Sequence, residues 1–383
     1  MRIIYLTTAI KKEDFESFSK MWRIALNPSN QNFHNKMIRS LALTNKVDAI
    51  SLRPFSISNC KAPYLSSETK EEDNITWHYL RVTAIKFLRN KLFERQAKAI
   101  LKKMDLSDAL IVCDTINPTT ITLANILKKL FNIKAVGTVT DSPSNISGTG
   151  KSYTLYLLKQ AETIDGFISL TEGLNNVYNQ NGRPFETIEG LVEENFPLSE
   201  NKYGKYFFFG GALMAKYGVY NLIEAFKRLG REDINLILCG HHCDNKALNA
   251  SIKSNPNIKY LRLLPVNEVL SLESHSIANI NPRPFTEDLD RYSVPSKTLE
   301  YLSSGSITIS VKNSILQPHF KNVAIWTETN SIDDLYDALT SVLIMDEEKR
   351  QQIGQAAKEK TVELFSLSSV NKKLDSFLIQ FVE

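Results

Sequence analysis

The stretch NPRPFTEDLDRYSVPSKTLEYLSSG, residues 281–305, carries the strongest local signals in the 383-residue chain. Its polar loop leads to Pro295, which suits the first turn of a helix, and Gly305 suits the end of that helix. Short apolar runs lie on either side, at 277–281 and 307–311. A strand, a loop, a helix and a second strand in this order predict one unit of a parallel α/β sheet.

The same alternation occurs in both halves of the chain. In the first half it predicts strands at 2–7, 47–52, 109–113, 135–140, 166–170 and 185–188. In the second half it predicts strands at 206–209, 235–239, 258–263, 277–281, 307–311 and 323–326. We therefore predict an α/β fold of two doubly wound parallel-sheet domains, 1–195 and 203–365, followed by a C-terminal helix, 366–383, that packs back on the first domain.

Composition excludes several classes of protein. With 43% hydrophobic and 23% charged residues, the chain is neither disordered nor fibrous. Its four cysteines are too few and too scattered for a disulfide framework, which fits a reducing compartment. The sequence contains neither a secretory apolar segment nor a run long enough to span a membrane, so we predict a cytoplasmic protein. A net charge of +4 and the lack of a recognisable binding motif argue against nucleic acid as a partner.

Residues 81–103 form a basic segment in which Glu94 is the one acid. Its bases are Arg81, Lys86, Arg89, Lys91, Arg95, Lys98, Lys102 and Lys103. This pattern fits peripheral contact with an anionic membrane on its cytoplasmic face, attraction of a phosphorylated substrate, or a solvated helix face. The sequence leaves these alternatives open, and it also leaves open a homo-oligomer.

The predicted helix start near Pro295 has the chemistry of a phosphate site. Ser296, Lys297 and Thr298 bring free backbone N–H groups, hydroxyls and an ammonium to one point, which suits a diphosphate. One turn further, the Glu300 carboxylate can accept hydrogen bonds from the 2′- and 3′-hydroxyls of a ribose. Spacing alone fits an ordinary capped helix with surface charges equally well.

With NPRP at 281–284 and YSVPSKTLEYLSSG at 292–305, the sequence resembles the family-four retaining glycosyltransferases, especially their bacterial capsule and exopolysaccharide branch. Further segments that are similar to the family lie at 27–38, 141–148, 169–178, 187–195, 207–226 and 235–240, so the resemblance covers most of the chain. It implies a GT-B fold, in which two Rossmann-like domains face a central cleft. It also implies a nucleotide-sugar donor, retention at the anomeric carbon, and no metal or other cofactor.

The resemblance assigns the donor residues one by one. Glu300 matches the second Glu of the family's E-x7-E pair, which binds ribose, and Ser296 and Thr298 belong to the same donor-binding run. Tyr292 stands where the first Glu of the pair is expected and is predicted to contact the donor. Glu287, in the longer loop, is the catalytic candidate that replaces that first Glu.

The family's glycine-rich loop corresponds to Gly211 and Lys216, and Lys216 is predicted to bind the diphosphate and to stabilise its charge during the reaction. Ala212 occupies the position where the family usually carries an Arg. Arg283 or Lys297 is therefore expected to supply the missing positive charge.

In the first domain, Asp141 stands where many relatives carry a His near the donor sugar, and we predict it as a catalytic polar contact. Capping of a turn is the alternative role for Asp141. Asn32 and His34, on an early loop, are predicted to bind the acceptor, and packing at a helix start is the alternative for His34.

Three short patterns mimic other functions. SGTGKS at 147–152 lacks the first glycine of a P-loop, and the cluster of Cys239, His241, His242 and Cys243 lacks the spacing of a zinc motif. The D-x-D pattern at 288–290 belongs to a single-domain class of sugar transferases. We therefore predict no metal site.

Together these features predict a retaining, metal-independent hexosyltransferase. It would move a sugar from a nucleotide-sugar donor, expected to be a UDP-sugar, to a saccharide or lipid-linked saccharide in surface polysaccharide synthesis. Ala212 and Tyr292 keep a second hypothesis open, a catalytically silent GT-B subunit that stabilises a partner transferase. A GT-B sugar epimerase is the third.

Overall fold

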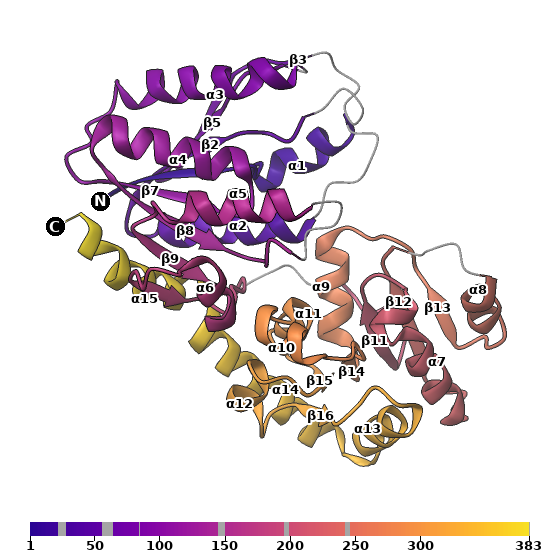
Figure 1. The fold of residues 1–383 in the computed structure, drawn as a ribbon. Helices are drawn as coiled ribbons and strands as arrows, with labels where there is room; N and C mark the ends of the chain where they lie inside the picture. The colour runs from indigo at the N-terminus through magenta and orange to yellow at the C-terminus, as the bar shows by residue number, and fades with distance from the viewer. Residues whose placement is uncertain are drawn as a thin grey trace. The chain divides into compact units, whose positions relative to one another are not determined.

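The computed structural model describes residues 1–21, 28–55, 64–83, 85–144, 150–194, 199–241 and 246–382. Contacts divide the chain into two compact units. Unit 1 comprises Met1–Leu191, Arg291–Ser293 and Leu367–Glu383, and unit 2 comprises Val192–Asp290 and Val294–Ser366. Each unit has its own sheet and its own hydrophobic core (Figure 1).

The sheet of unit 1 has the strand order β10-β9-β8-β7-β1-β2-β5-β4, and β4 runs antiparallel to β5. Its strands are β1 (Arg2–Thr7), β2 (Lys46–Ser51), β4 (Glu68–Glu72), β5 (Ile75–Tyr79), β7 (Ala109–Asp114), β8 (Lys134–Val139), β9 (Gly166–Ser169) and β10 (Phe185–Thr187). A small separate pair joins β3 (Tyr64–Leu65) to β6 (Val82–Thr83). The six strands predicted for this half are confirmed to within one residue at each end, whereas β3 to β6 were not predicted.

The helices of unit 1 are α1 (Lys12–Ser19), α2 (Pro28–Leu41), α3 (Lys86–Leu101), α4 (Pro118–Phe131), α5 (Lys151–Ala161), α6 (Glu172–Tyr178) and α15 (Leu367–Leu378), followed by the short η2 (Ile379–Phe381). Helix α4 packs against both α3 and α5, and α2 packs against α15 (Figure 1). Two hydrogen bonds hold α15 in place: Ser40 Oγ donates to Leu367 O at 2.8 Å, and Asn45 Nδ2 donates to Asp375 Oδ1 at 2.7 Å.

The sheet of unit 2 is entirely parallel, in the order β13-β12-β11-β14-β15-β16. Its strands are β11 (Tyr206–Gly210), β12 (Asn235–Cys239), β13 (Ile258–Tyr260), β14 (Ala278–Asn281), β15 (Ile307–Val311) and β16 (Ile325–Thr327). From β11 the chain adds β12 and β13 on one side and then β14 to β16 on the other. The strand order therefore reverses between β11 and β14, and ligands bind at the carboxyl ends of the strands at such a point.

The helices of unit 2 are η1 (Ala215–Tyr217), α7 (Val219–Arg228), α8 (Lys246–Lys253), α9 (Val266–His275), α10 (Glu287–Tyr292), α11 (Ser296–Leu302), α12 (Leu316–Phe320), α13 (Ile332–Ile344) and α14 (Glu347–Phe365), and α10 ends on two residues of unit 1. Helix α7 packs with α13, while α11 packs with β15 and α14. Among the described residues, no helix combines the length and the apolar character that crossing a membrane requires.

Candidate functional site

The loop that follows β11 lies against two neighbouring segments of unit 2. Gly211 N donates to Cys239 O at 2.9 Å, and a Cβ atom on Gly240 would lie 1.9 Å from Gly211 O. Gly218 has φ of +75°, and a Cβ atom there would lie 2.0 Å from Pro282 O. Both contacts are backbone to backbone, so glycine at 218 and at 240 is what lets the loops after β11, β12 and β14 meet.

Two cations from these loops share one aromatic ring. The Nζ of Lys216 lies 5.1 Å from the centre of the Tyr217 ring, and the guanidinium carbon of Arg283 lies 5.4 Å from the same centre. Both distances are in the range of cation–π attraction. Because Lys216 follows β11 and Arg283 follows β14, the positive charges meet at the point where the strand order reverses.

Buried hydrogen bonds fix the start of α11 to the sheet. Asn281 Nδ2 donates to Thr298 Oγ1 at 2.8 Å, and Thr298 Oγ1 lies 3.0 Å from Ser310 Oγ. All three residues are buried. The Thr298 hydroxyl is therefore committed to β14 and β15 and serves to position α11, while a donor contact through its backbone N–H stays a prediction.

Lys297 lies between two carboxylates. Its Nζ donates to Glu300 Oε1 at 3.1 Å and lies 3.9 Å from Glu273 Oε1. The side chains of Lys297 and Glu300 are 39% and 31% exposed, whereas that of Glu273 is 0% exposed. Burial favours the neutral form of Lys297, but Glu300 and Glu273 outweigh it and hold the pKa of Lys297 above its ordinary value. Lys297 is therefore a cation at neutral pH.

Tyr301 joins α11 to the end of β11. Its hydroxyl accepts from Gly210 N at 2.8 Å and donates to Gly210 O at 3.2 Å, and burial raises the pKa of this fully buried phenol. Tyr301, Tyr217 and Glu273 were not predicted as site residues from the sequence, because their contacts depend on neighbours from other elements.

Two predicted residues lie on α10. Glu287 is exposed at its first turn. Tyr292 is grouped by its contacts with unit 1, where it packs partly buried against the core. Asp290 Oδ1 accepts from Ser314 N at 2.7 Å, which gives part of the D-x-D pattern a structural role. The described residues contain no metal-binding group of three or more His, Cys, Asp or Glu.

His34 is a correction. It was expected on a loop, yet it lies inside α2 and is 0% exposed. Its Nδ1 is 2.7 Å from Tyr5 Oη, and its Nε2 is 3.4 Å from Asp114 Oδ2. The ring is therefore part of a buried polar chain and has no surface for an acceptor, whereas Asn32 on the same helix is exposed.

Asp141 follows β8 and is partly buried. Its Oδ1 accepts a hydrogen bond from the adjacent Ser142 N at 2.7 Å. Two of the patterns that mimic other functions lie partly outside the described residues. Residues 145–149, which include the start of the P-loop-like run, and residues 242–245, which include His242 and Cys243, are not described.

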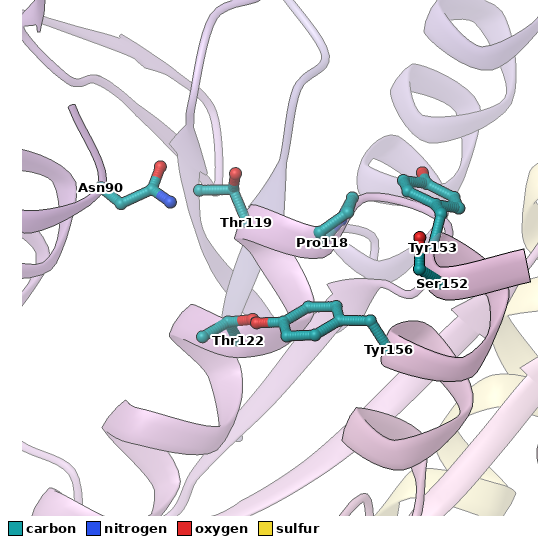
Figure 2. A pocket seen from close by; sticks show the side chains of 7 residues that line it. All are labelled: Asn90, Pro118, Thr119, Thr122, Ser152, Tyr153 and Tyr156. Carbon is teal, nitrogen blue, oxygen red and sulfur yellow. The ribbon is translucent and has the colours of Figure 1, made fainter. Parts of the chain in front are cut away.

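Unit 1 also carries an open pocket of about 410 Å³ among α3, α4 and α5 (Figure 2). It is lined by Asn90, Pro118, Thr119, Thr122, Ser152, Tyr153 and Tyr156. Figure 2 shows the Tyr156 hydroxyl pointing to Thr122, and the two oxygens are 2.6 Å apart. None of the residues predicted for the site lines this pocket.

Comparison with known proteins agrees with the geometry of unit 2. Residues 193–360 match the family described as glycosyl transferases group 1. No curated protein sequence matches the chain.

Solved structures share the fold over the whole length. A sucrose-phosphate synthase from Thermosynechococcus elongatus is 12% identical with a TM-score of 0.68, and 99% of each chain is covered. An E. coli trehalose-6-phosphate protein bound with UDP-2-fluoro glucose is 12% identical with a TM-score of 0.67, again over 99% of each chain. HepE of Anabaena in complex with UDP and glucose is 11% identical with a TM-score of 0.65, over 99% of this chain and 100% of that one. The predicted GT-B fold, with two parallel-sheet Rossmann-like domains, is thereby confirmed.

Proposed function

We propose that this chain, whose residues 193–360 match the group 1 glycosyl transferases, is a retaining and metal-independent hexosyltransferase that uses a nucleotide-sugar donor. The observation that carries the proposal is the convergence of Lys216 and Arg283 on Tyr217 where the strand order of unit 2 reverses. A UDP-sugar is the expected donor, because two similar structures hold UDP or a UDP-sugar.

Lys216 and Arg283 are assigned to the diphosphate. A hydrogen bond to a charged group contributes about 1.5–3 kcal/mol, so the absence of an arginine at Ala212 needs a replacement. Arg283 and Lys297 were the two residues expected to supply the positive charge that is missing at Ala212. The geometry favours Arg283, since it meets Lys216 at one ring, whereas Lys297 is held by two carboxylates.

Glu300 is assigned to the ribose. Its carboxylate is partly exposed on α11, and it can accept two hydrogen bonds from vicinal hydroxyls. The same helix is bonded through Tyr301 to Gly210, at the start of the loop that carries Lys216. Ribose and diphosphate contacts therefore come from connected parts of unit 2.

The chemistry follows from these charges. Glycosyl transfer passes through an oxocarbenium-like transition state and leaves negative charge on the departing nucleoside diphosphate. Lys216 and Arg283 are placed to stabilise that charge. The nucleophile is a hydroxyl of the acceptor. It forms the new glycosidic bond on the face that the diphosphate leaves, which accounts for retention. The bond from the anomeric carbon to the diphosphate breaks, and the hydroxyl proton passes to the departing diphosphate oxygen. Glu287 and Asp141 are the proposed polar contacts to the reacting sugar.

We assign the acceptor to the class of saccharides and lipid-linked saccharides of surface polysaccharide synthesis, with Asn32 as an exposed contact. Helix α3 supports a lipid-linked acceptor at the cytoplasmic face of a membrane. Exposed apolar side chains, Ile85 at 56% and Leu88 at 45%, accompany its exposed bases. Those bases are Lys91 and Arg95 on the helix and Arg81, Lys102 and Lys103 beside its ends. Apolar and basic side chains together fit an anionic membrane better than a purely solvated face.

A panel of UDP-, GDP- and ADP-sugars incubated with the purified protein tests the proposal. Transfer to a saccharide, or slow hydrolysis of one donor, supports it. Formation of an epimer would instead establish a sugar epimerase. Donor binding without turnover, together with stabilisation of a partner transferase, would establish the silent subunit.

A further inference from the structure

Glu273 is a fully buried acid that sequence analysis did not single out. It lies near the end of α9, and its Oε1 is 3.9 Å from Lys297 Nζ. An ionised carboxylate is costly to remove from water unless a counter-charge accompanies it. The Lys297 ammonium, 39% exposed, is a counter-charge that reaches it.

Lys297 also contacts a second carboxylate, which is partly exposed to solvent. Its Nζ donates to Glu300 Oε1 at 3.1 Å, so the three side chains form a chain from the buried Glu273 to the partly exposed Glu300. This chain sets two carboxyl groups against one ammonium, so it offers a diphosphate no surplus of positive charge. The partly exposed Glu300 carboxylate suits ribose hydroxyls instead, which donate hydrogen bonds to a carboxylate.

The cations for a diphosphate lie elsewhere in unit 2, where Lys216 and Arg283 share the Tyr217 ring. A lysine ammonium on its flexible four-carbon stem can turn toward any nearby anion. A buried carboxylate behind Lys297 opposes that movement, because a turn toward the diphosphate would leave Glu273 without this counter-charge. We therefore expect Lys297 to keep its hydrogen bond to Glu300 when a diphosphate is bound.

We infer that Glu273 is a positioning residue that acts through Lys297 and holds the Glu300 carboxylate in the orientation that receives the 2′- and 3′-hydroxyls of the donor's ribose. The inference rests on the proposed function, since it assumes that Glu300 binds a ribose. In this inference Lys297 orients Glu300, whereas Lys216 and Arg283 bind the diphosphate.

The test compares a ribose with a ribose that lacks both hydroxyls. Calorimetry measures the affinities of UDP and 2′,3′-dideoxy-UDP for the wild type and for Glu273→Gln, which keeps the shape of the side chain and removes its charge. The affinities of GDP and ADP are measured in the same way, each with its 2′,3′-dideoxy analogue. For the wild type we expect the ribonucleotide to bind about ten- to a hundredfold more tightly. In Glu273→Gln this preference should fall about tenfold, while the affinity for the dideoxy analogue stays the same.

Two further variants keep the result interpretable. If Glu273→Gln folds poorly, the double variant Glu273→Gln/Lys297→Met removes the buried carboxyl group and its cation, so no uncompensated charge is left at the buried position, and it should lose the preference equally. Glu268→Gln changes an exposed acid on the same helix and should keep the wild-type preference.

The outcomes separate the inference from the proposed function. A wild-type protein that binds none of the diphosphates contradicts the proposed function itself. If the wild type binds the ribonucleotides and their dideoxy analogues equally tightly, Glu300 does not bind the ribose, and the inference about Glu273 is overturned as well. If the wild type prefers the ribose and Glu273→Gln keeps that preference in full, or weakens both ligands equally, the positioning role is overturned and the proposed function stands.

Discussion

Lys216 and Arg283 lie over the same aromatic ring, although they follow different strands of the sheet of unit 2. Their strands, β11 and β14, are hydrogen-bonded neighbours, and the strand order reverses between them. Parallel strands present their carboxyl ends at one edge, so the topology brings together two cations that are distant in the sequence. Under the proposed function, these two cations are the positive partners of the donor's diphosphate.

Replacing either cation should weaken the diphosphate contact specifically. Lys216→Met and Arg283→Met should each reduce the calorimetric affinity for UDP by about ten- to a hundredfold, because each removes a charge-assisted hydrogen bond. Binding of the nucleoside alone should stay unchanged. Lys321→Met, which removes an exposed lysine of unit 2, is the matched control. Equal losses for UDP and for uridine would show that the variants disturb the fold instead of the phosphate site.

Gly218 should be irreplaceable for steric reasons. Alanine at Gly218 or at Gly230 must adopt a positive φ, +75° or +60°, at a cost of about 1–2 kcal/mol. At Gly230 the added Cβ meets nothing within 4 Å, whereas at Gly218 it would lie 2.0 Å from Pro282 O. We expect Gly218→Ala to lower the thermal unfolding temperature more than Gly230→Ala and also to weaken UDP binding, since Arg283 follows Pro282. Equal effects of the two variants on both measurements would refute the contact.

Much of the fold and part of the site were predictable from the sequence. Most of the buried parallel strands were found because they are continuous apolar runs, whereas the parallel strand β5 was missed because its sequence, ITWHY, alternates buried and half-buried side chains. β4 was missed because its sequence, ETKEE, is charged and its side chains are mostly exposed. Glu300 and Lys216 lie in recognisable motifs, but the pairing of Arg283 with Lys216 depends on strand order, which local sequence does not contain. The burial of Glu273 and His34 likewise depends on neighbours from distant elements.

His34 should matter for stability and not for donor binding. His34→Leu removes the contacts with Tyr5 and Asp114 inside unit 1, and we expect it to lower the free energy of unfolding by about 2–3 kcal/mol. The exposed Asn32, on the same helix, should tolerate alanine with a change of about 0.5 kcal/mol or less. Urea unfolding measures both variants. A His34→Leu protein of wild-type stability with impaired transfer would restore a direct role in acceptor binding.

The stability of unit 2 should depend on pH through Cys239. Burial raises the pKa of this thiol from 9.0 to about 11, so the folded state keeps the proton over a range in which the unfolded state loses it. The contribution of this proton to the free energy of unfolding is complete below pH 9.0. It is lost at about 1.4 kcal/mol per pH unit as the pH rises toward 11. Urea unfolding of the wild type and Cys239→Ala should therefore converge with increasing pH. Parallel curves would show that the thiol does not titrate this way.

Unit 2 is proposed to bind a nucleotide sugar through Glu300 and through the two cations at Tyr217. Calorimetric titration of UDP-glucose, with other UDP- and GDP-sugars in parallel, into the wild type and Glu300→Ala tests this proposal. We predict measurable binding of one donor by the wild type and an affinity about ten- to a hundredfold lower for Glu300→Ala, with the thermal unfolding temperature unchanged. The same affinity in both proteins would contradict the account.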